Sequence, residues 1–299
     1  MAFVSDRRTK LPHLTTIGLV FGLIVAPAIA RAEPRLACPP EMALVSQSCV
    51  DRWEATLVEV HKNGSESPWT PYYTPMGRVV RAISKPGVVP QGYVSMAIAW
   101  GACRKSGKRL CHAKEWIAAC RGAQKGAWPY GAVRLPGVCI DHGRTYALPK
   151  LHSGAERYEN RTMNDPRLNQ LENTVALTGS APGCTNELGV FDMVGNLNEW
   201  IDDQTMRGGF YLDVEQLGEG CGYATKAHSK VYDDYSTGFR CCKDAEVEPE
   251  RDSCATVGER DERGVLDLAF DVSTTIEPLA AFIASFANGS ARGVCTPSG

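Results

Sequence analysis

The sequence predicts an α+β protein with low regular secondary structure that is rich in disulfides. Three observations support this fold class. The chain of 299 residues contains 12 cysteines, more than reduced cytosolic proteins of this size usually carry. Its 29 glycines and 18 prolines divide it into short segments. Between residues 38 and 244, only two stretches show the apolar spacing of an α-helix.

Residues 1–32 have the features of a secretory signal peptide. A basic start precedes an apolar run over 15–28, and the small residues Ala30 and Ala32 mark a cleavage site. The apolar run is short for a spanning helix, although an uncleaved anchor is the alternative. We therefore expect a mature protein that begins near Glu33, is exported to the periplasm or the extracellular space, and has no stable membrane insertion.

The elements of the mature chain are short. The apolar spacing predicts a first helix over Val94 to Lys105 and a second over Ala113 to Arg121, with Gly122 as its C-terminal stop. Apolar and β-branched residues bounded by turn residues predict short strands. These strands cover residues 190–194, 208–212 and 237–241.

The C-terminal part differs from the rest in composition. Residues 246–299 hold ten acidic and four basic residues, which separates this acidic tail from a domain over 33–245. Within the tail, residues 275–287 are expected to form one short helix that packs on the domain. The formal net charge of the whole chain is −2, and no basic cluster stands out, so a nucleic-acid partner is not expected.

Four strings in the domain occur in an order and spacing that resemble the formylglycine-generating enzyme, or sulfatase-modifying factor, family. The resemblance covers about residues 38–244 and implies the C-type-lectin-like FGE-sulfatase fold. The strings are Gly107–Leu110 followed by Glu115 and Trp116, then Phe191–Trp200, Arg207–Gly209 and Gly238–Cys241.

The second string carries a candidate calcium site. Asp192 and Glu199 flank a Gly-Asn turn, an arrangement that can bring two carboxylates and backbone carbonyls onto one hard cation. The simpler interpretation is a solvated turn followed by a core tryptophan. The resemblance implies that Asp192, Gly195 (backbone), Leu197 (backbone) and Glu199 bind Ca²⁺.

The resemblance also implies a copper chemistry that this sequence lacks the residues to support. Oxidases of the family convert a substrate cysteine to formylglycine with Cu(I) and O₂, using two cysteines five apart after the Gly-Gly pair. Here no cysteine lies between Gly209 and Cys221, and Phe210 and Asn198 replace a serine and a tryptophan of the oxidases. We expect no copper centre, and we expect Asn198 and Phe210 to line a candidate ligand cleft.

Other polar residues have simpler interpretations. Arg109 and Arg240 are expected to satisfy backbone carbonyls of irregular loops, with substrate binding as the alternative. His142 and His152, in a loop with Asp141, are the best candidates for a different metal, although a hydrogen-bonded histidine is the default for each.

The twelve cysteines allow six disulfides. The resemblance implies that Cys103 pairs with Cys241 and that Cys120 pairs with Cys221, and swapped partners at Cys241 and Cys242 are an alternative. The remaining pairs are inferred from spacing alone. They are Cys38–Cys49, Cys111–Cys242, Cys139–Cys184 and Cys254–Cys295.

Three functional hypotheses follow. The first is an exported sulfatase-modifying-factor-like domain, a pseudoenzyme without the oxidase activity. Such a domain would serve as a binding, scaffold or maturation module for an unknown protein or peptide partner. The second is a metal-dependent oxidase of the same family with a rearranged site, acting in cysteine oxidation or siderophore maturation. The third is a cell-envelope structural protein whose tail docks a partner.

Overall fold

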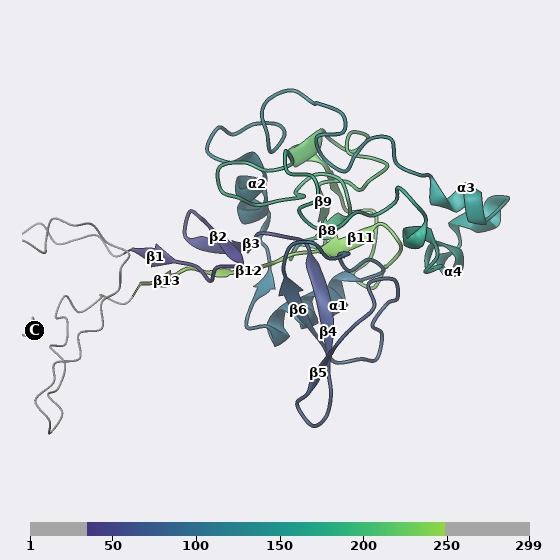
Figure 1. Ribbon diagram of the computed structural model, residues 1–299, viewed down its shortest axis with the longest axis horizontal. Helices are drawn as coiled ribbons and strands as arrows, with labels where there is room; N and C mark the ends of the chain where they lie inside the picture. The colour runs from purple at the N-terminus through teal and green to yellow at the C-terminus, as the bar shows by residue number, and fades with distance from the viewer. Residues whose placement is uncertain (1–34, 249–299) are drawn as a thin grey trace, which may run out of the picture. The chain divides into compact units, whose positions relative to one another are not determined.

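The computed structural model describes residues 35–248 (Figure 1). Three predictions lie outside these residues: the signal peptide over 1–32, the Cys254–Cys295 bond and the tail helix over 275–287. Within the described part, the longest helix has ten residues and the longest strand has six. Short strands, short helices and long irregular loops alternate along the chain, which confirms the α+β fold class with little regular secondary structure.

Three small sheets and one two-stranded ribbon make up the strand content (Figure 1). The first sheet has the order β2 (Met42–Val45), β3 (Ser48–Asp51), β12 (Cys241–Asp244) and β7 (Arg109–Leu110). The second has the order β10 (Ala224–Thr225), β9 (Met206–Arg207), β8 (Asn198–Trp200) and β11 (Thr237–Phe239). The third has the order β5 (Glu66–Pro68), β4 (Ala55–Val60) and β6 (Val80–Ser84). The ribbon pairs β1 (Leu36–Ala37) with β13 (Glu246–Val247).

Both predicted helices are present. Helix α1 (Met96–Lys105) begins two residues later than expected, because the side chain of Ser95 caps it by accepting a hydrogen bond from the Ile98 N–H. Helix α2 (Ala113–Arg121) ends at Gly122, which has a positive φ of 60°. The remaining helical segments are single turns. They are α3 (Ala147–Leu151), η1 (Ala155–Tyr158), α4 (Asn160–Met163), η2 (Leu168–Gln170) and η3 (Gly220–Gly222).

Two of the three predicted strands do not form. Residues 190–194 are irregular because Asp192 adopts a positive φ of 57°, which an extended strand cannot accommodate. Residues 208–212 turn instead, since Gly208 and Gly209 both have positive φ and Phe210 forms only an isolated bridge with Asp213. The segment 237–241 does form a strand and continues as β12.

Five disulfides join residues that are 11 to 138 positions apart, and no cysteine within residues 35–248 is free. Two of them hold neighbouring residues of β12, linking it to α1 and to the residue after β7. The five bonds coincide with five of the six pairs expected from the sequence. They are Cys38–Cys49, Cys103–Cys241, Cys111–Cys242, Cys120–Cys221 and Cys139–Cys184.

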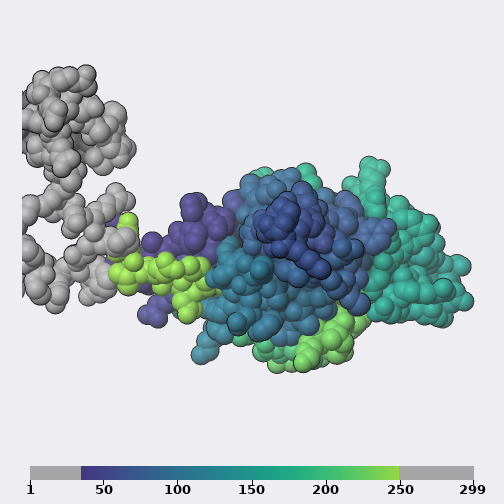
Figure 2. All heavy atoms as spheres, turned by 90° about the horizontal axis from the view of Figure 1, so that it is seen from below, coloured from purple at the N-terminus to yellow at the C-terminus, as the bar shows by residue number. Residues whose placement is uncertain are grey.

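The two ends of the described chain lie side by side. The register of the ribbon pairs Leu36 with Val247, and Figure 2 shows the purple and yellow-green ends in contact. The segment with α3 and α4 lies at the opposite end of the domain in both views (Figures 1 and 2). The first and last described residues therefore lie together at one end of the domain.

Candidate functional site

Three carboxylates and one guanidinium meet in the interior of the domain. Glu54 stands directly before β4, Asp192 lies in the irregular loop after Val190, and Glu199 is the middle residue of β8. Arg240 joins β11 to β12. All four side chains are almost completely buried, so their mutual charges act with little screening by water.

Glu199 is fully engaged by protein donors. The Arg240 Nη2 and Nε lie 2.6 and 2.9 Å from its Oε1, and the Nε also lies 2.7 Å from its Oε2. The indole N–H of Trp116 donates to the Oε2 at 2.6 Å. Burial alone would lower the pKa of Arg240, but the charge and hydrogen bonds of Glu199 raise it above its ordinary value.

Glu54 holds the turn that precedes β8. Its Oε1 accepts a hydrogen bond from the Leu197 N–H at 3.1 Å, and its Oε2 accepts one from the Asn196 Nδ2 at 2.6 Å. Burial raises the pKa of Glu54 well above its ordinary range, and the charges of Asp192 and Glu199 raise it further. Glu54 was not among the site residues predicted from the sequence. Its contacts are more than 140 residues away, and no local pattern marks them.

Asp192 has one satisfied and one unsatisfied carboxylate oxygen. Its Oδ2 accepts a hydrogen bond from the Gly179 N–H at 2.6 Å, whereas its Oδ1 is buried without a partner among the described residues. Burial raises the pKa of Asp192 to about 6. An unpaired buried carboxylate oxygen is costly, and it is also the kind of atom that binds a cation.

The four residues of the predicted calcium site lie in one segment, and the carboxylates of Asp192 and Glu199 belong to the same buried cluster. Gly195 packs so closely on Ile140 that an added Cβ would lie 2.3 Å from its carbonyl oxygen, and Leu197 is a core residue. Among residues 35–248, no group of three acidic, histidine or cysteine side chains is arranged to hold a metal ion. Glu199 is bound by Arg240, Asp192 has one carboxylate oxygen without a partner among the described residues, and the calcium site remains a prediction.

Arg240 also contacts the backbone. This is the role expected of it from the sequence, in which it serves the fold. Its Nη1 donates to the carbonyls of Asp51 and Arg52, and its Nη2 donates to the carbonyl of Phe191 at 2.8 Å. Sequence reasoning anticipated the carbonyl contacts but not the pair with Glu199. One guanidinium thus ties together β3, β8 and the loop that carries Asp192.

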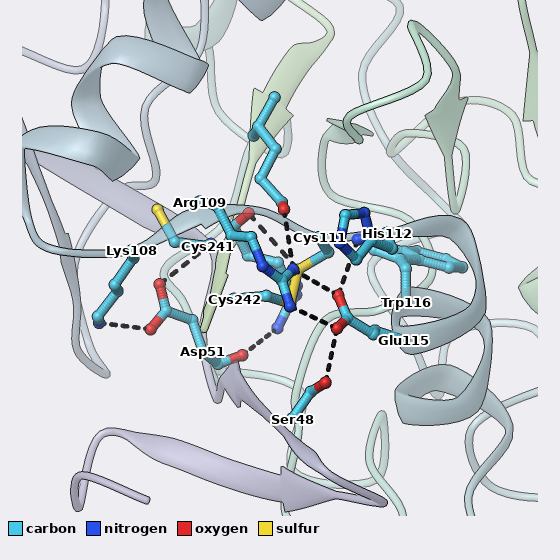
Figure 3. Close-up of a disulfide and its surroundings, with 12 residues drawn as sticks. Ser48, Asp51, Lys108, Arg109, Cys111, His112, Glu115, Trp116, Cys241 and Cys242 are labelled. Carbon is cyan, nitrogen blue, oxygen red and sulfur yellow. Dashed lines mark hydrogen bonds and ion pairs between the residues drawn. A yellow bond between two sulfur atoms is a disulfide. The ribbon is translucent and has the colours of Figure 1, made fainter. Parts of the chain in front are cut away.

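A polar layer surrounds the Cys111–Cys242 disulfide (Figure 3). Arg109 forms a two-point contact with Glu115 at 2.6 and 2.7 Å, so its main partner is a carboxylate rather than the expected carbonyls. Lys108 donates to the buried Asp51 at 2.7 Å. Burial raises the pKa of Asp51 to about 6, although the positive charge of Lys108 opposes this shift.

The two residues of the predicted ligand cleft lie in different environments. Asn198 is buried at 5 % exposure, with its Oδ1 unpaired and its Nδ2 donating to the Ser236 Oγ at 3.4 Å. Phe210 packs edge-on against Tyr211 and Tyr235, with ring centroids 5.4 and 6.0 Å apart. Neither residue lines the cavities described next, and the open cleft remains a prediction.

The histidines proposed as metal candidates line different cavities. His152 lies in a cavity of about 410 Å³ beside α3, where its Nε2 is 2.9 Å from the Asp165 carboxylate. His142 lines a cavity of about 380 Å³ with Arg134 and Asp141. Asp141 lines the same cavity as His142 and pairs with Arg134 at 3.0 Å. Because His152 lines a different cavity, the structure does not bring the three candidates together.

The fold and the site define a disulfide-clamped domain of small sheets and irregular loops around a buried carboxylate–arginine cluster. Residues 51–245 match the profile of the sulfatase-modifying factor enzyme 1-like domain, and the chain therefore belongs to this family. Among solved structures, the chain is similar to the protein in the crystal structure of CarF. That similarity has 14% identity and a TM-score of 0.38, and it covers 67% of this chain and 87% of that one. No curated protein matches the chain.

Within the part of the chain that the structure describes, no helix has the length and apolar character needed to cross a membrane. The five disulfides indicate an oxidising compartment.

Proposed function

We propose that this protein is an exported member of its family that does not form formylglycine and acts as a binding, scaffold or maturation module for a protein or peptide. One observation carries the proposal. The segment after Gly208 and Gly209 has no cysteine before Cys221, and Cys221 is bonded to Cys120. Cu(I) is a soft ion that prefers thiolate ligands, and a disulfide sulfur is not a thiolate.

The aromatic residues around Phe210 support a binding role. Phe210 and its neighbours Tyr211 and Tyr235 form an aromatic cluster, and Tyr211 and Tyr235 are nearly fully buried. Phe210 is half-buried and is the member of the cluster that can give apolar contact to a ligand, with the two buried tyrosines packed against it. The cluster has no thiolate. The chain keeps the fold of its family without the thiolates of the oxidases.

The test is a combined thiol count and aldehyde assay on the full chain. We expect no free thiol in the unreduced, denatured protein and no aldehyde after incubation with Cu(I), O₂ and a sulfatase-derived cysteine peptide. A family member with the cysteine pair is the positive control. Two free thiols together with aldehyde formation would overturn the proposal and favour the oxidase with a rearranged site.

Export is tested separately by the mass of the secreted protein. We expect a mature chain that begins at Glu33 in the periplasmic or extracellular fraction. A chain retained in the cytoplasm with residues 1–32 attached would contradict this part of the proposal.

Calcium at Asp192 is part of the same proposal. The unpaired Oδ1 of Asp192 and the excess of three carboxylates over one guanidinium support a cation there. Ca²⁺ would supply charge balance and hold the loop against β8. Because Arg240 already binds Glu199, Asp192 is the carboxylate available to the calcium ion.

A further inference from the structure

Two exposed tyrosines meet at their hydroxyl groups. Tyr146 stands directly before α3 and Tyr158 is the last residue of η1, and the two residues are 46% and 55% exposed. Their hydroxyl oxygens lie 3.4 Å apart, although the residues are 12 positions apart in the sequence. A hydrogen bond of this length between exposed groups adds little to stability. The contact does, however, hold two phenols close together where solvent reaches both of them.

The other tyrosines are arranged differently. All ten tyrosines of the chain lie within residues 35–248. Tyr73 is also exposed, but its hydroxyl contacts no other residue of the described chain. Tyr211 and Tyr235 have ring centroids 6.3 Å apart, but both are buried in the core. Within the described chain, exposure and contact between two tyrosine hydroxyls therefore occur together at this one pair.

Arg157 favours the ionised form of Tyr158. The guanidinium carbon of Arg157 lies 4.9 Å from the centre of the Tyr158 ring, and its Nε is shielded from solvent without an acceptor. The hydrogen bond with Tyr146, followed by the interaction with Arg157, lowers the pKa of Tyr158, whereas the bond with Tyr158 raises the pKa of Tyr146. A phenolate gives up an electron more readily than a neutral phenol does. Tyr158 is therefore the ring of the pair that is oxidised first.

The contact has the geometry of a dityrosine bond. In dityrosine, two phenol rings are joined through the carbons next to their hydroxyls, so that the two hydroxyls lie side by side. We propose that Tyr146 and Tyr158 are a site of oxidative cross-linking within one chain, with hydrogen peroxide and a peroxidase as the oxidant. Two rings held together in one chain couple more readily than rings of separate molecules. This site does not depend on the binding function proposed above.

The reaction consumes one molecule of peroxide for each cross-link. Each phenol loses one electron and one proton, which gives two tyrosyl radicals, and the peroxide is reduced to two molecules of water. The radicals couple to form a carbon–carbon bond between the Cε atoms beside the two hydroxyls. The hydrogen of each of these carbons then moves to the phenol oxygen of the same ring, so that both rings are phenols again. The chain loses two hydrogen atoms in total.

The cross-link would close a ring next to the cavity of about 410 Å³. Four of the residues that line this cavity lie between the two tyrosines in the sequence, among them His152. A bond between Tyr146 and Tyr158 would fix the ends of this segment and restrain one wall of the cavity. Helix α3 lies at one end of the domain (Figure 1), on the far side from the β1–β13 ribbon, where an oxidant has access to the exposed rings.

The test is peptide mapping of the full chain after treatment with hydrogen peroxide and a peroxidase. Trypsin cuts after four basic residues that separate the two tyrosines. They are Arg144, Lys150, Arg157 and Arg161. We expect peptides 145–150 and 158–161 to be recovered as one species, whose mass is the sum of both minus two hydrogen atoms. This species should come from protein that stays monomeric on a denaturing gel, and blue dityrosine fluorescence should appear with it.

The variants Y146F and Y158F should each lower the dityrosine fluorescence about tenfold or more, since only coupling between molecules then remains. Both rings are exposed, so loss of a hydroxyl leaves the fold intact. The matched control is Y73F, which removes an exposed tyrosine hydroxyl elsewhere and should cross-link as the wild type does. Absence of the linked peptide in the wild type, its presence only in covalent dimers, or an equal loss in Y73F would overturn the proposal.

Discussion

Arg240 and Glu199 form an ion pair whose side chains are 0% and 1% exposed, with the Arg240 Nη2 2.6 Å from the Glu199 Oε1. Two further carboxylates, Glu54 and Asp192, lie near enough for their charges to raise the pKa of Arg240. One guanidinium thus serves three buried acids. Its removal would leave all three without a cation in a medium that solvates charge poorly.

We therefore predict that Arg240→Met lowers the free energy of unfolding by about 3–5 kcal/mol, the usual cost of breaking a buried pair by removing one partner. Denaturant titration followed by tryptophan fluorescence measures this change. The control is Arg161→Met, because Arg161 is 77% exposed and its pair with Glu159 contributes about 1 kcal/mol or less. Equal losses in the two variants would show that the buried pair contributes no more to the free energy of unfolding than an exposed pair does.

Stability should rise as the pH falls from neutrality. The pKa of both Asp51 and Asp192 is raised to about 6 in the folded state, mainly by burial. Both bind a proton more tightly when folded than when unfolded, so protonation between about pH 6 and pH 4 favours folding. We predict a thermal midpoint higher at about pH 5 than at about pH 7, measured by calorimetry with a chelator present.

This gain in stability should reverse in stronger acid. Hydrogen bonds from Arg167 lower the pKa of Asp165 to about 2. Burial alone would raise the pKa of Glu115, but hydrogen bonds from Arg109 and Ser48 lower it to about 2. Their contribution is lost as the pH falls below about 4. Asp192→Asn should reduce the rise between neutral and mildly acidic pH, and an unchanged rise in this variant would contradict the role of Asp192.

Local patterns in the sequence were sufficient to predict the helices and the family to which the fold belongs. The apolar spacing and Gly122 are local signals, so the ends of α1 and α2 could be predicted within two residues. The start of α1 was placed too early because the cap at Ser95 was not part of that prediction. The strand predicted over 190–194 failed because the apolar run there is interrupted by a left-handed residue, Asp192. Nothing within the run itself predicts that conformation.

The buried cluster was only partly accessible from the sequence. Asp192 and Glu199 belong to one string, and their spacing indicated a shared site. The contribution of Glu54, and the pairing of Glu199 with Arg240, depend on contacts across more than 40 residues. Hydrophobic periodicity has no information on such contacts, because they form only when the sheets assemble.

Metal analysis of the purified protein tests the calcium prediction. We expect the wild type to retain Ca²⁺ and Asp192→Ala to lose it, since Asp192 provides the unpaired carboxylate oxygen. Glu199→Ala should also lose the bound Ca²⁺ if Glu199 binds the ion in place of Arg240. Asp203→Ala, which removes an acid that pairs with Lys226, is the control and should retain the metal. A wild type without calcium would make the assignment wrong.

The neighbouring disulfides Cys103–Cys241 and Cys111–Cys242 should be partly redundant. Each closes a loop of more than 130 residues when considered alone. With one bond intact, however, breaking the other reopens a loop of only about ten residues, since their ends lie close along the chain. Replacing either pair with alanine should therefore cost only about 3 kcal/mol in loop-closure entropy, in addition to the packing lost in the core.

Removing both bonds reopens a longer loop. Cys120–Cys221 still limits that loop to about thirty residues, so the combined loss should exceed the sum of the two single losses by about 1 kcal/mol. Unfolding titrations of the two double-alanine variants and the quadruple variant, each with its other cysteines oxidised, measure this coupling. If the two single losses simply add, the two bonds constrain the unfolded chain independently. The bonds at the neighbouring cysteines of β12 would then not be redundant.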